Sequence, residues 1–248
     1  MGGCTVAPDS SSLYQIETRI RAALQTPLPG GDAHLSLAPR PRKGWRPDHV
    51  PEGAKPAAGL VLLYTRNDEP HLLLTVRAGA LPQHGGQVSL PGGKVEPEET
   101  IPAAALREAA EEVGVEPGRV RLLGRLSPLY VFVSNFALHP VVGVAAGHPA
   151  FKPRSAEVRR VLEVPLAAFH GPRARPRRGF ICRPEALVRV PYLEVRDERV
   201  WGATAMILAE LLTMLGGGPS DPWVDASMDT ARSVAPPAPA AVRVGASG

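Results

Sequence analysis

The chain has 248 residues, of which 44% are hydrophobic and 21% are charged, a composition that indicates a folded protein with one sizeable core. Its formal net charge is +4, and its two cysteines, Cys4 and Cys182, are too few for a disulfide framework and lack metal-ligand spacing. No segment reaches the length of a transmembrane helix, and no signal peptide is evident. These features argue against an integral membrane protein and a disulfide-rich secreted domain, and we expect a cytoplasmic protein.

The N-terminal part, residues 1–56, is predicted to lie outside the main domain. Within it, residues 15–24 place Ile16 and Ile20 at helical spacing, which predicts an amphipathic helix that packs on the domain edge. Residues 28–56 are rich in Pro, Gly and Arg, so we expect a connecting loop.

The hydrophobic pattern is concentrated in residues 57–216, which we predict to form the main domain. Two segments, 100–113 and 202–215, have the character of helices, and Arg-Asn-Asp-Glu-Pro between the first two strands predicts a hairpin turn. The predicted strands are 59–64, 71–77, 120–126, 137–146, 157–165 and 187–195. Strands packed between helices make an α/β (α+β) sandwich.

The C-terminal segment, residues 217–248, is rich in Pro and Ala and carries neither a core pattern nor strong charge. Such a composition cannot bury enough apolar surface to order a chain, so we expect a disordered tail.

Basic residues cluster in segments 40–46 and 172–183. Neither segment carries aromatic residues at a stacking spacing or a recognised nucleic-acid motif, so we favour solvated loops and expect no nucleic-acid partner.

The stretch from Gly93 to Val115 carries an arginine and several carboxylates downstream of a Gly-Gly turn. Thr100 is suited to cap a helix N-terminus, and Gly114 lies where a left-handed residue would end that helix. Apolar residues recur at three- and four-residue spacing and predict a buried stripe, while the polar residues share the opposite, solvent-facing side. The stripe consists of Leu106, Ala109, Ala110 and Val113, and the polar side of Arg107, Glu108, Glu111 and Glu112.

Glu108 and Glu112 form an i,i+4 pair of like charges, which is unfavourable unless a cation relieves it. Hard divalent ions, Mg²⁺ above all, bind such oxygen clusters together with substrate phosphates and water. The alternative interpretation is a solvated acidic helix face.

This stretch resembles the Nudix box, G-x5-E-x7-R-E-U-x-E-E-x-G-U, in which U is a bulky aliphatic residue. Only Ala109 departs from the pattern, as a smaller apolar residue at the first U position. The resemblance implies the Nudix α/β/α sandwich around a mixed sheet. The matching positions are Gly93, Glu99, Arg107, Glu108, Glu111, Glu112, Gly114 and Val115.

By the same resemblance, Glu108 and Glu112 bind the catalytic cation, Mg²⁺ or Mn²⁺, and Glu111 joins them through a second ion or a water. The carbonyl group of Gly92 is a further expected ligand.

The resemblance also implies that Arg107 orients Glu111 through an i,i+4 ion pair and that Glu99 braces the loop. Among the box acids, Glu111 is our first choice for the general base.

The residues before the box read LLTVRAGALPQHGGQVSLPGG, which resembles the signature of the coenzyme A pyrophosphatase branch of Nudix hydrolases. Ala78 and Leu90 replace the serine and phenylalanine of that signature. Arg77 ends a β-like run and leads into a polar loop, where a guanidinium can contact a phosphate bidentately, with a surface ion pair as the alternative. His84 and Gln87 can hydrogen-bond a diphosphate or hold the loop in place.

Later segments extend the likeness to about residues 57–213, through SNFALHPVVG, AEVRRVLEVPL and PYLEVRDERVWGATAMILAELL. Arg160 stands where the family often has an acid, which leaves Glu157 as the only nearby substitute for an extra carboxylate. The basic segment 172–183 offers a second possibility besides a solvated loop, attraction of the phosphates of a coenzyme A molecule.

The resemblance implies a metal-dependent hydrolase that cleaves the diphosphate bond of coenzyme A or acyl-coenzyme A. Two alternatives stay open: a Nudix hydrolase of another nucleoside diphosphate derivative, such as ADP-ribose or NADH, and a non-catalytic Nudix regulator that binds a nucleotide. The sequence leaves open whether the chain forms a homodimer.

Overall fold

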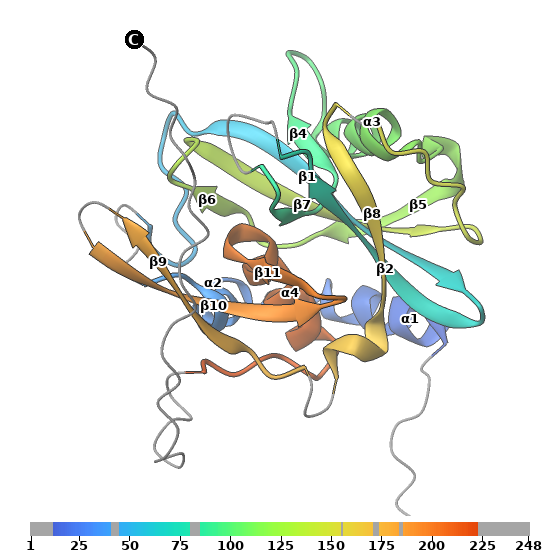
Figure 1. The fold of residues 1–248 in the computed structure, drawn as a ribbon. Coiled ribbons are helices and arrows are strands. Elements are labelled where there is room, and N and C mark those ends of the chain that lie inside the picture. Colours follow the sequence, from blue (N-terminus) through green and yellow to red (C-terminus); the bar gives the residue numbers. More distant parts are fainter. Residues whose placement is uncertain are drawn as a thin grey trace, which may run out of the picture.

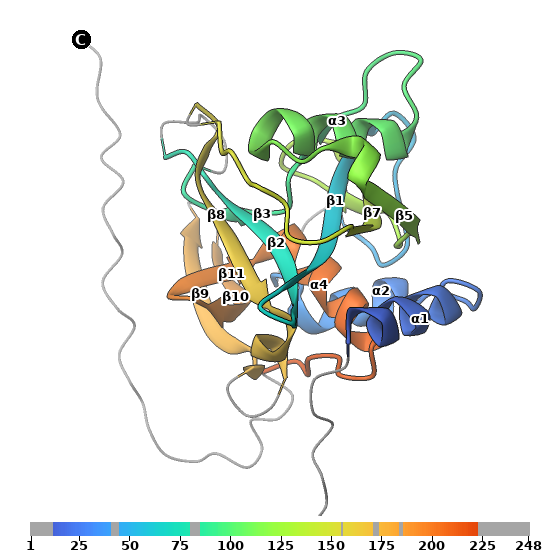
Figure 2. The ribbon, with the colours of Figure 1, turned by 90° about the vertical axis from the view of Figure 1, so that its right-hand side faces the viewer.

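A computed structural model describes residues 12–40, 45–79, 85–154, 156–170, 174–183 and 186–222 and confirms the predicted α+β architecture around a mixed sheet. An eight-stranded sheet has helices on both faces, and a three-stranded sheet lies beside it (Figures 1 and 2). The large sheet consists of β1 (Lys55–Arg66), β2 (Glu69–Arg77), β3 (Val88–Ser89), β4 (Gly92–Lys94), β5 (Val120–Arg125), β6 (Leu129–Val131), β7 (Phe136–Ala145) and β8 (Val158–Pro165). The small sheet consists of β9 (Arg177–Arg183), β10 (Ala186–Val195) and β11 (Glu198–Trp201). The helices are α1 (Leu13–Ala23), α2 (Gly30–Leu37), α3 (Ile101–Val113) and α4 (Gly202–Met214), with short 3₁₀ turns at η1 (Pro117–Arg119) and η2 (Leu166–Phe169).

Strand β1 changes partners along its length. Its first half pairs with β4, with Gly59 opposite Gly92, and its second half pairs with β2, with Leu63 opposite Leu72. The C-terminal end of β2 pairs instead with β3, while β8 pairs with β2 along nearly its whole length, from His71 to Arg77. The chain between β3 and β4 therefore crosses from β2 to β1, at the end of the sheet where these two strands part.

The β1–β2 hairpin has the turn that the sequence predicts. Asn67 and Asp68 both have positive φ angles, 49° and 62°. This left-handed pair is the backbone of a two-residue hairpin turn, and Asn and Asp tolerate it better than most residues.

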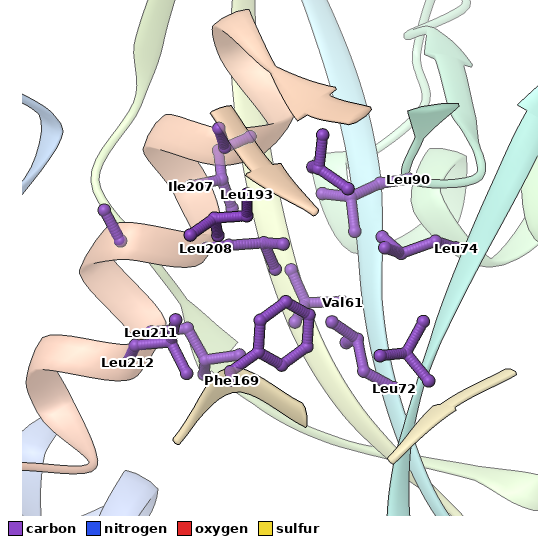
Figure 3. Packing of buried hydrophobic residues seen from close by; sticks show 14 of the residues in the cluster. Val61, Leu72, Leu74, Leu90, Phe169, Leu193, Ile207, Leu208, Leu211 and Leu212 are labelled. Carbon is purple, nitrogen blue, oxygen red and sulfur yellow. The ribbon is translucent and has the colours of Figure 1, made fainter. Parts of the chain in front are cut away.

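Alternate residues of β1 point to opposite faces of the sheet, so the protein has two apolar clusters. Leu60 and Leu62 lie in the cluster that contains α3, whereas Val61 lies with Ile207 and Leu211 in the cluster that contains α4. Figure 3 shows the second cluster, with α4 side chains facing β1 and β2. Although α4 is buried on nearly every side, no helix in the described ranges is long and apolar enough to cross a membrane.

The predicted N-terminal helix is confirmed as α1, with Ile16 and Ile20 buried. The prediction of a connecting loop over 28–56 is wrong in part, because this segment contains α2. The eight residues of α2 have weak local signals, and the helix depends on tertiary burial: Leu37 has no exposed surface and His34 is 1% exposed.

The basic segment 172–183 is also not a loop throughout, because β9 begins at Arg177 and pairs with β10 in antiparallel register. At the C-terminal end, the chain runs beside this sheet as far as Pro222. Asp221 forms an ion pair with Arg40 at 3.0 Å, and Arg178 Nε donates to the Pro222 carbonyl at 2.8 Å. The rest of the predicted tail lies outside the described residues.

A buried carboxylate joins α2 to α4. Glu210 on α4 has no exposed surface and accepts hydrogen bonds from Ser127 Oγ at 2.6 Å, His34 Nε2 at 3.1 Å and the Gly30 N–H at 3.3 Å. Burial pushes the pKa of Glu210 up, but the hydrogen bonds from His34 and Ser127 outweigh it, so the pKa lies below its usual value. The described residues of α2 are therefore packed against α4 by buried polar contacts.

Substituting Glu210→Gln should lower the free energy of unfolding at pH 7 by about 2–3 kcal/mol, because an amide nitrogen would face N–H donors in a buried site. A lowered folded pKa means that the carboxylate stabilises the protein above its unfolded pKa, and that this stability is lost as pH falls through the folded pKa. Urea denaturation at pH 7 and pH 4 should therefore show a difference that shrinks with acid. Glu116→Gln, at an exposed position, is the control, and equal midpoints for Glu210→Gln and wild type would contradict the assignment.

Candidate active site

Helix α3 is held at both ends by the residues that the sequence identifies as caps. Thr100 Oγ1 accepts the Ala103 N–H at 3.3 Å, and Gly114 has a φ of 73°. A side chain at position 114 would also press on Lys152, whose Cβ lies 3.1 Å from where a Cβ of residue 114 would be. Glycine is thus needed both for the left-handed turn and for close packing of the next segment.

The Gly-Gly turn forms β4 and passes very close to its neighbours. A Cβ on Gly92 would lie 2.2 Å from the Ala58 carbonyl oxygen, and one on Gly93 would lie 2.4 Å from Glu108 Oε1. The absence of side chains therefore lets the Glu108 carboxylate rest directly against the backbone of β4.

Arg107 is the most heavily bonded side chain of the site. Its Nε and Nη2 donate to the two oxygens of Glu99 at 2.9 and 3.0 Å, and Nη2 also donates to the Lys94 carbonyl at 2.9 Å. Its Nη1 donates to Glu108 at 3.0 Å and lies 3.5 Å from Glu111 Oε2. The guanidinium thus ties the loop before α3 to the acids on the helix. Its hydrogen bonds to Glu99 raise the pKa of Arg107 and outweigh the opposing effect of burial. The Lys94 carbonyl has no signal in the sequence, because backbone groups contribute to every motif alike.

The predicted solvent-facing position of Glu112 is wrong. The residue is 3% exposed, because α3 lies on β1 and β4 with this part of its circumference turned toward them. Glu112 Oε2 accepts the Gly92 N–H at 3.2 Å, and Oε1 lies 3.9 Å from Arg77 Nη1. Burial raises the pKa of Glu112 to about 7, with the charges of Glu108 and Glu157 adding to the shift and the two contacts opposing it.

Glu108 lies one turn before Glu112 and has a similar character. Burial raises its pKa, while Arg107 opposes the shift and the charges of Glu111 and Glu157 add to it. Glu111 is different, since its side chain is 49% exposed. The structure therefore brings Glu108 and Glu112 together in a partly dry site and leaves Glu111 at its rim.

Glu157 enters this group from outside the box. The Ala78 N–H donates to its carbonyl at 2.8 Å, which fixes the start of β8 beside the end of β2. Its charge acts on both Glu108 and Glu112. The sequence points to Glu157 only as a substitute, since no local pattern shows that the start of β8 lies against α3.

Of the three predicted substrate-binding residues, two are described. Arg77 lies beside Glu112 and its buried Nε has no hydrogen-bond partner in the described part of the chain. The Arg77 N–H donates to the Gln87 carbonyl at 3.0 Å, so Gln87 stands next to it across the base of the loop. His84 lies outside the described residues.

These residues suit a divalent cation that shares its ligands with a substrate. Within the described ranges, no three acidic, histidine or cysteine side chains converge tightly enough to hold a cation by themselves. However, Glu108 and Glu112 are two neighbouring carboxylates whose pKa values are raised by burial, so a cation would relieve an unfavourable pair. Mg²⁺ in phosphate-processing sites is commonly bound by one or two carboxylates, with phosphate oxygens and water as its other ligands. The site thus has the chemistry of a metal-assisted diphosphate hydrolase.

Comparison with known proteins agrees with this class. A family profile described as "NUDIX domain" matches residues 53–182, just over half of the chain. The "Uncharacterized Nudix hydrolase NudL" of Escherichia coli O6:H1 is 39% identical over 168 residues, which cover 65% of this chain and 84% of that protein. The protein of the same name from Pectobacterium atrosepticum is 40% identical over 152 residues, covering 60% of this chain and 78% of its own. A solved Nudix hydrolase from M. smegmatis, RenU, is 24% identical with a TM-score of 0.41, over 46% of this chain and 73% of that one.

The chain belongs to the Nudix family. It is a hydrolase of phosphorus-containing acid anhydrides whose substrates are small nucleoside diphosphate derivatives, and Nudix hydrolases generally use divalent metal ions.

Substituting Glu112→Gln should abolish turnover and yet stabilise the metal-free protein. The pKa of Glu112 is about 7 in the folded protein, against 4.5 for an ordinary glutamate, as in the unfolded chain. Ionisation of this acid therefore destabilises the fold as pH rises from 4.5 to 7. The amide mimics the protonated acid. In EDTA at pH 8 the variant should therefore have a higher melting temperature than wild type, with a free energy of unfolding larger by at most about 3 kcal/mol. At pH 4 the two proteins should have the same stability.

Turnover with excess Mg²⁺ should fall at least about 100-fold in the same variant, since a charged ligand is lost. Glu98→Gln, in the exposed turn before α3, is the matched control and should change neither property. Wild-type turnover by Glu112→Gln, or a lower melting temperature than wild type at pH 8 in EDTA, would contradict the assignment.

Proposed function

We propose that the protein hydrolyses the diphosphate bond of coenzyme A or its acyl thioesters, with Mg²⁺ or Mn²⁺, and releases 3′,5′-ADP and 4′-phosphopantetheine or its acyl form. The observation that carries this proposal is the position of Arg77. This residue belongs to the segment that resembles the coenzyme A pyrophosphatase signature, and its guanidinium lies 3.9 Å from the buried box acid Glu112. A diphosphate bound at the box acids would therefore lie within reach of Arg77.

In this proposal the buried and the exposed acids of the box have different roles. Glu108 and Glu112 would hold the cation, with the Gly92 carbonyl as a further ligand, and Glu111 would join them through a second ion or a water. When bound, the cation would neutralise charge on the diphosphate and lower the pKa of the attacking water.

The remaining residues bind, orient and move a proton. Arg107 is the positioning residue, because its bonds to Glu99, Glu108 and the Lys94 carbonyl keep the acids in place. Glu111, at the rim, takes the proton from the water. Glu157 is the second candidate for that role, since its charge acts on the same pair of acids.

Arg77 is proposed to clamp a phosphate. Its Nε, which has no hydrogen-bond partner among the described residues, and its other guanidinium nitrogens form a planar fork that suits two phosphate oxygens. His84 and Gln87, which follow in the sequence, are proposed as hydrogen-bond partners of the same group.

The rival within the enzyme class is a Nudix hydrolase of ADP-ribose or NADH, and the rival outside it is a non-catalytic Nudix domain that binds a nucleotide as a regulator. The presence of Glu108, Glu111 and Glu112 supports catalysis over regulation. A hydrolysis screen separates the three: coenzyme A, 3′-dephospho-coenzyme A, ADP-ribose and NADH, each with Mg²⁺ and with Mn²⁺. Preference for coenzyme A supports the proposal, preference for ADP-ribose or NADH replaces it, and no turnover of any substrate favours the regulator.

The proposal includes a cytoplasmic location and no nucleic-acid partner. Both follow from the composition and motifs of the sequence, and a homodimer is compatible with the proposed chemistry.

Substituting Arg77→Ala should raise KM for coenzyme A more than it lowers kcat, because the clamp acts on the ground state as well as on the transition state. Arg77→Lys should restore only part of the loss, since an ammonium restores the charge but cannot make the planar two-point contact. Steady-state kinetics with a thermal melt checks this. If Arg77 serves only in a surface ion pair, kcat/KM will stay unchanged and stability will fall by at most about 1 kcal/mol.

A further inference from the structure

The segment between β7 and β8 is attached to the end of α3 that carries the buried acid. The Lys152 N–H donates to the Val113 carbonyl and the Arg154 N–H donates to the Glu112 carbonyl, each at 2.8 Å. Figure 2 shows this segment passing beside α3 on its way to β8. These two backbone bonds, and the close approach of Lys152 to Gly114, hold Lys152 and Arg154 at the C-terminal end of α3, next to the backbone of Glu112.

These two side chains differ from the other cations near the site. Arg107 is bound by Glu99 and Glu108, and Arg159 and Arg160 both donate to Glu198. Lys152 and Arg154, in contrast, are exposed, and neither has an ion-pair partner within the described ranges. Among the described residues, no acid pairs with these two positive charges, which lie by the helix end that bears Glu112.

A solvated pair of charges at a helix C-terminus is stabilising on its own, through the partial negative charge of the last carbonyls. That stabilising effect does not require the two side chains to point in a particular direction, and it does not require a substrate. However, the helix end that they cover here is the one that bears Glu112, so a polyanion bound at the box acids would lie within their field.

We propose that Lys152 and Arg154 form a cationic lip that binds a phosphate monoester of the substrate, next to the diphosphate that is cleaved. The inference rests on the proposed function: in coenzyme A this group is the 3′-phosphate of the ribose that adjoins the diphosphate. The lip then makes the enzyme prefer the 3′-phosphorylated substrate, through ground-state binding by charge-assisted hydrogen bonds.

The test compares the double variant Lys152→Ala/Arg154→Ala with wild type on coenzyme A and on 3′-dephospho-coenzyme A. The expected result is a loss of kcat/KM for coenzyme A of about tenfold or more, mostly through KM, with the dephospho substrate nearly unaffected. Arg154→Glu, which reverses one charge, should widen the loss for coenzyme A alone. Arg19→Ala is the matched control, since Arg19 is an exposed arginine without an ion-pair partner in the described part of the chain, on α1 and thus on the opposite face of the sheet.

The outcomes separate the lip from the function on which it depends. If wild type cleaves both substrates and the variants change kcat/KM for the two substrates equally or not at all, the lip is refuted and the proposed function stands. If wild type cleaves neither substrate but cleaves ADP-ribose or NADH, the proposed function fails and the lip loses its ligand with it. Thermal melts of each variant, expected to match wild type, exclude a loss caused by unfolding.

Discussion

The other features of the site depend on one constraint, the burial of the Glu112 carboxylate. The side chain is 3% exposed, and it meets the β4 backbone through the Gly92 N–H and the end of β2 through Arg77. Glycine is required at 92 and 93, because larger residues would collide with β1 and with Glu108. Glycine at 114 is required because the next segment packs on it. The glycines of the box thus allow the close approach of backbone to carboxylate, which holds the acids where we propose that a cation binds.

Two buried glutamates show how the same side chain is used for structure and for chemistry. Glu210 is surrounded by donors from Ser127, His34 and Gly30, so its charge is satisfied and its pKa is lowered. Glu112 has one backbone donor and a guanidinium at 3.9 Å, so its pKa is raised to about 7. An acid that is left under-satisfied in a dry place lowers the stability of the empty protein and is prepared for a cation.

Local patterns predicted the elements that have strong local signals. The capped helix α3, the Asn67–Asp68 turn and the long strands of the large sheet follow from periodicity and turn chemistry. Several of the elements that were missed depend on their partners in the fold: α2 is held by α4, the three residues of β4 are a strand only because β1 pairs with them, and β9 needs the adjacent strand β10. The burial of Glu112 has the same origin, since an amphipathic pattern gives the apolar stripe of a helix but not the width of the face that a sheet covers. For the site, the sequence identified the acids of the box, whereas the approach of Glu157 arises from the tertiary course of the chain between β7 and β8.

The arginines of the site divide by how fully they are bound. Arg107 makes four hydrogen bonds, including both oxygens of Glu99, and has little capacity left for a ligand. Arg77 is held by its backbone, through Gly86 and Gln87, while its Nε lacks a partner among the described residues and its only ion pair is long. An arginine whose backbone is fixed and whose Nε lacks an acceptor among the described residues is suited to an anionic ligand, because the ligand supplies the missing acceptor without first breaking strong bonds. By the same reasoning we propose that Arg107 belongs to the framework of the site and Arg77 to its substrate side.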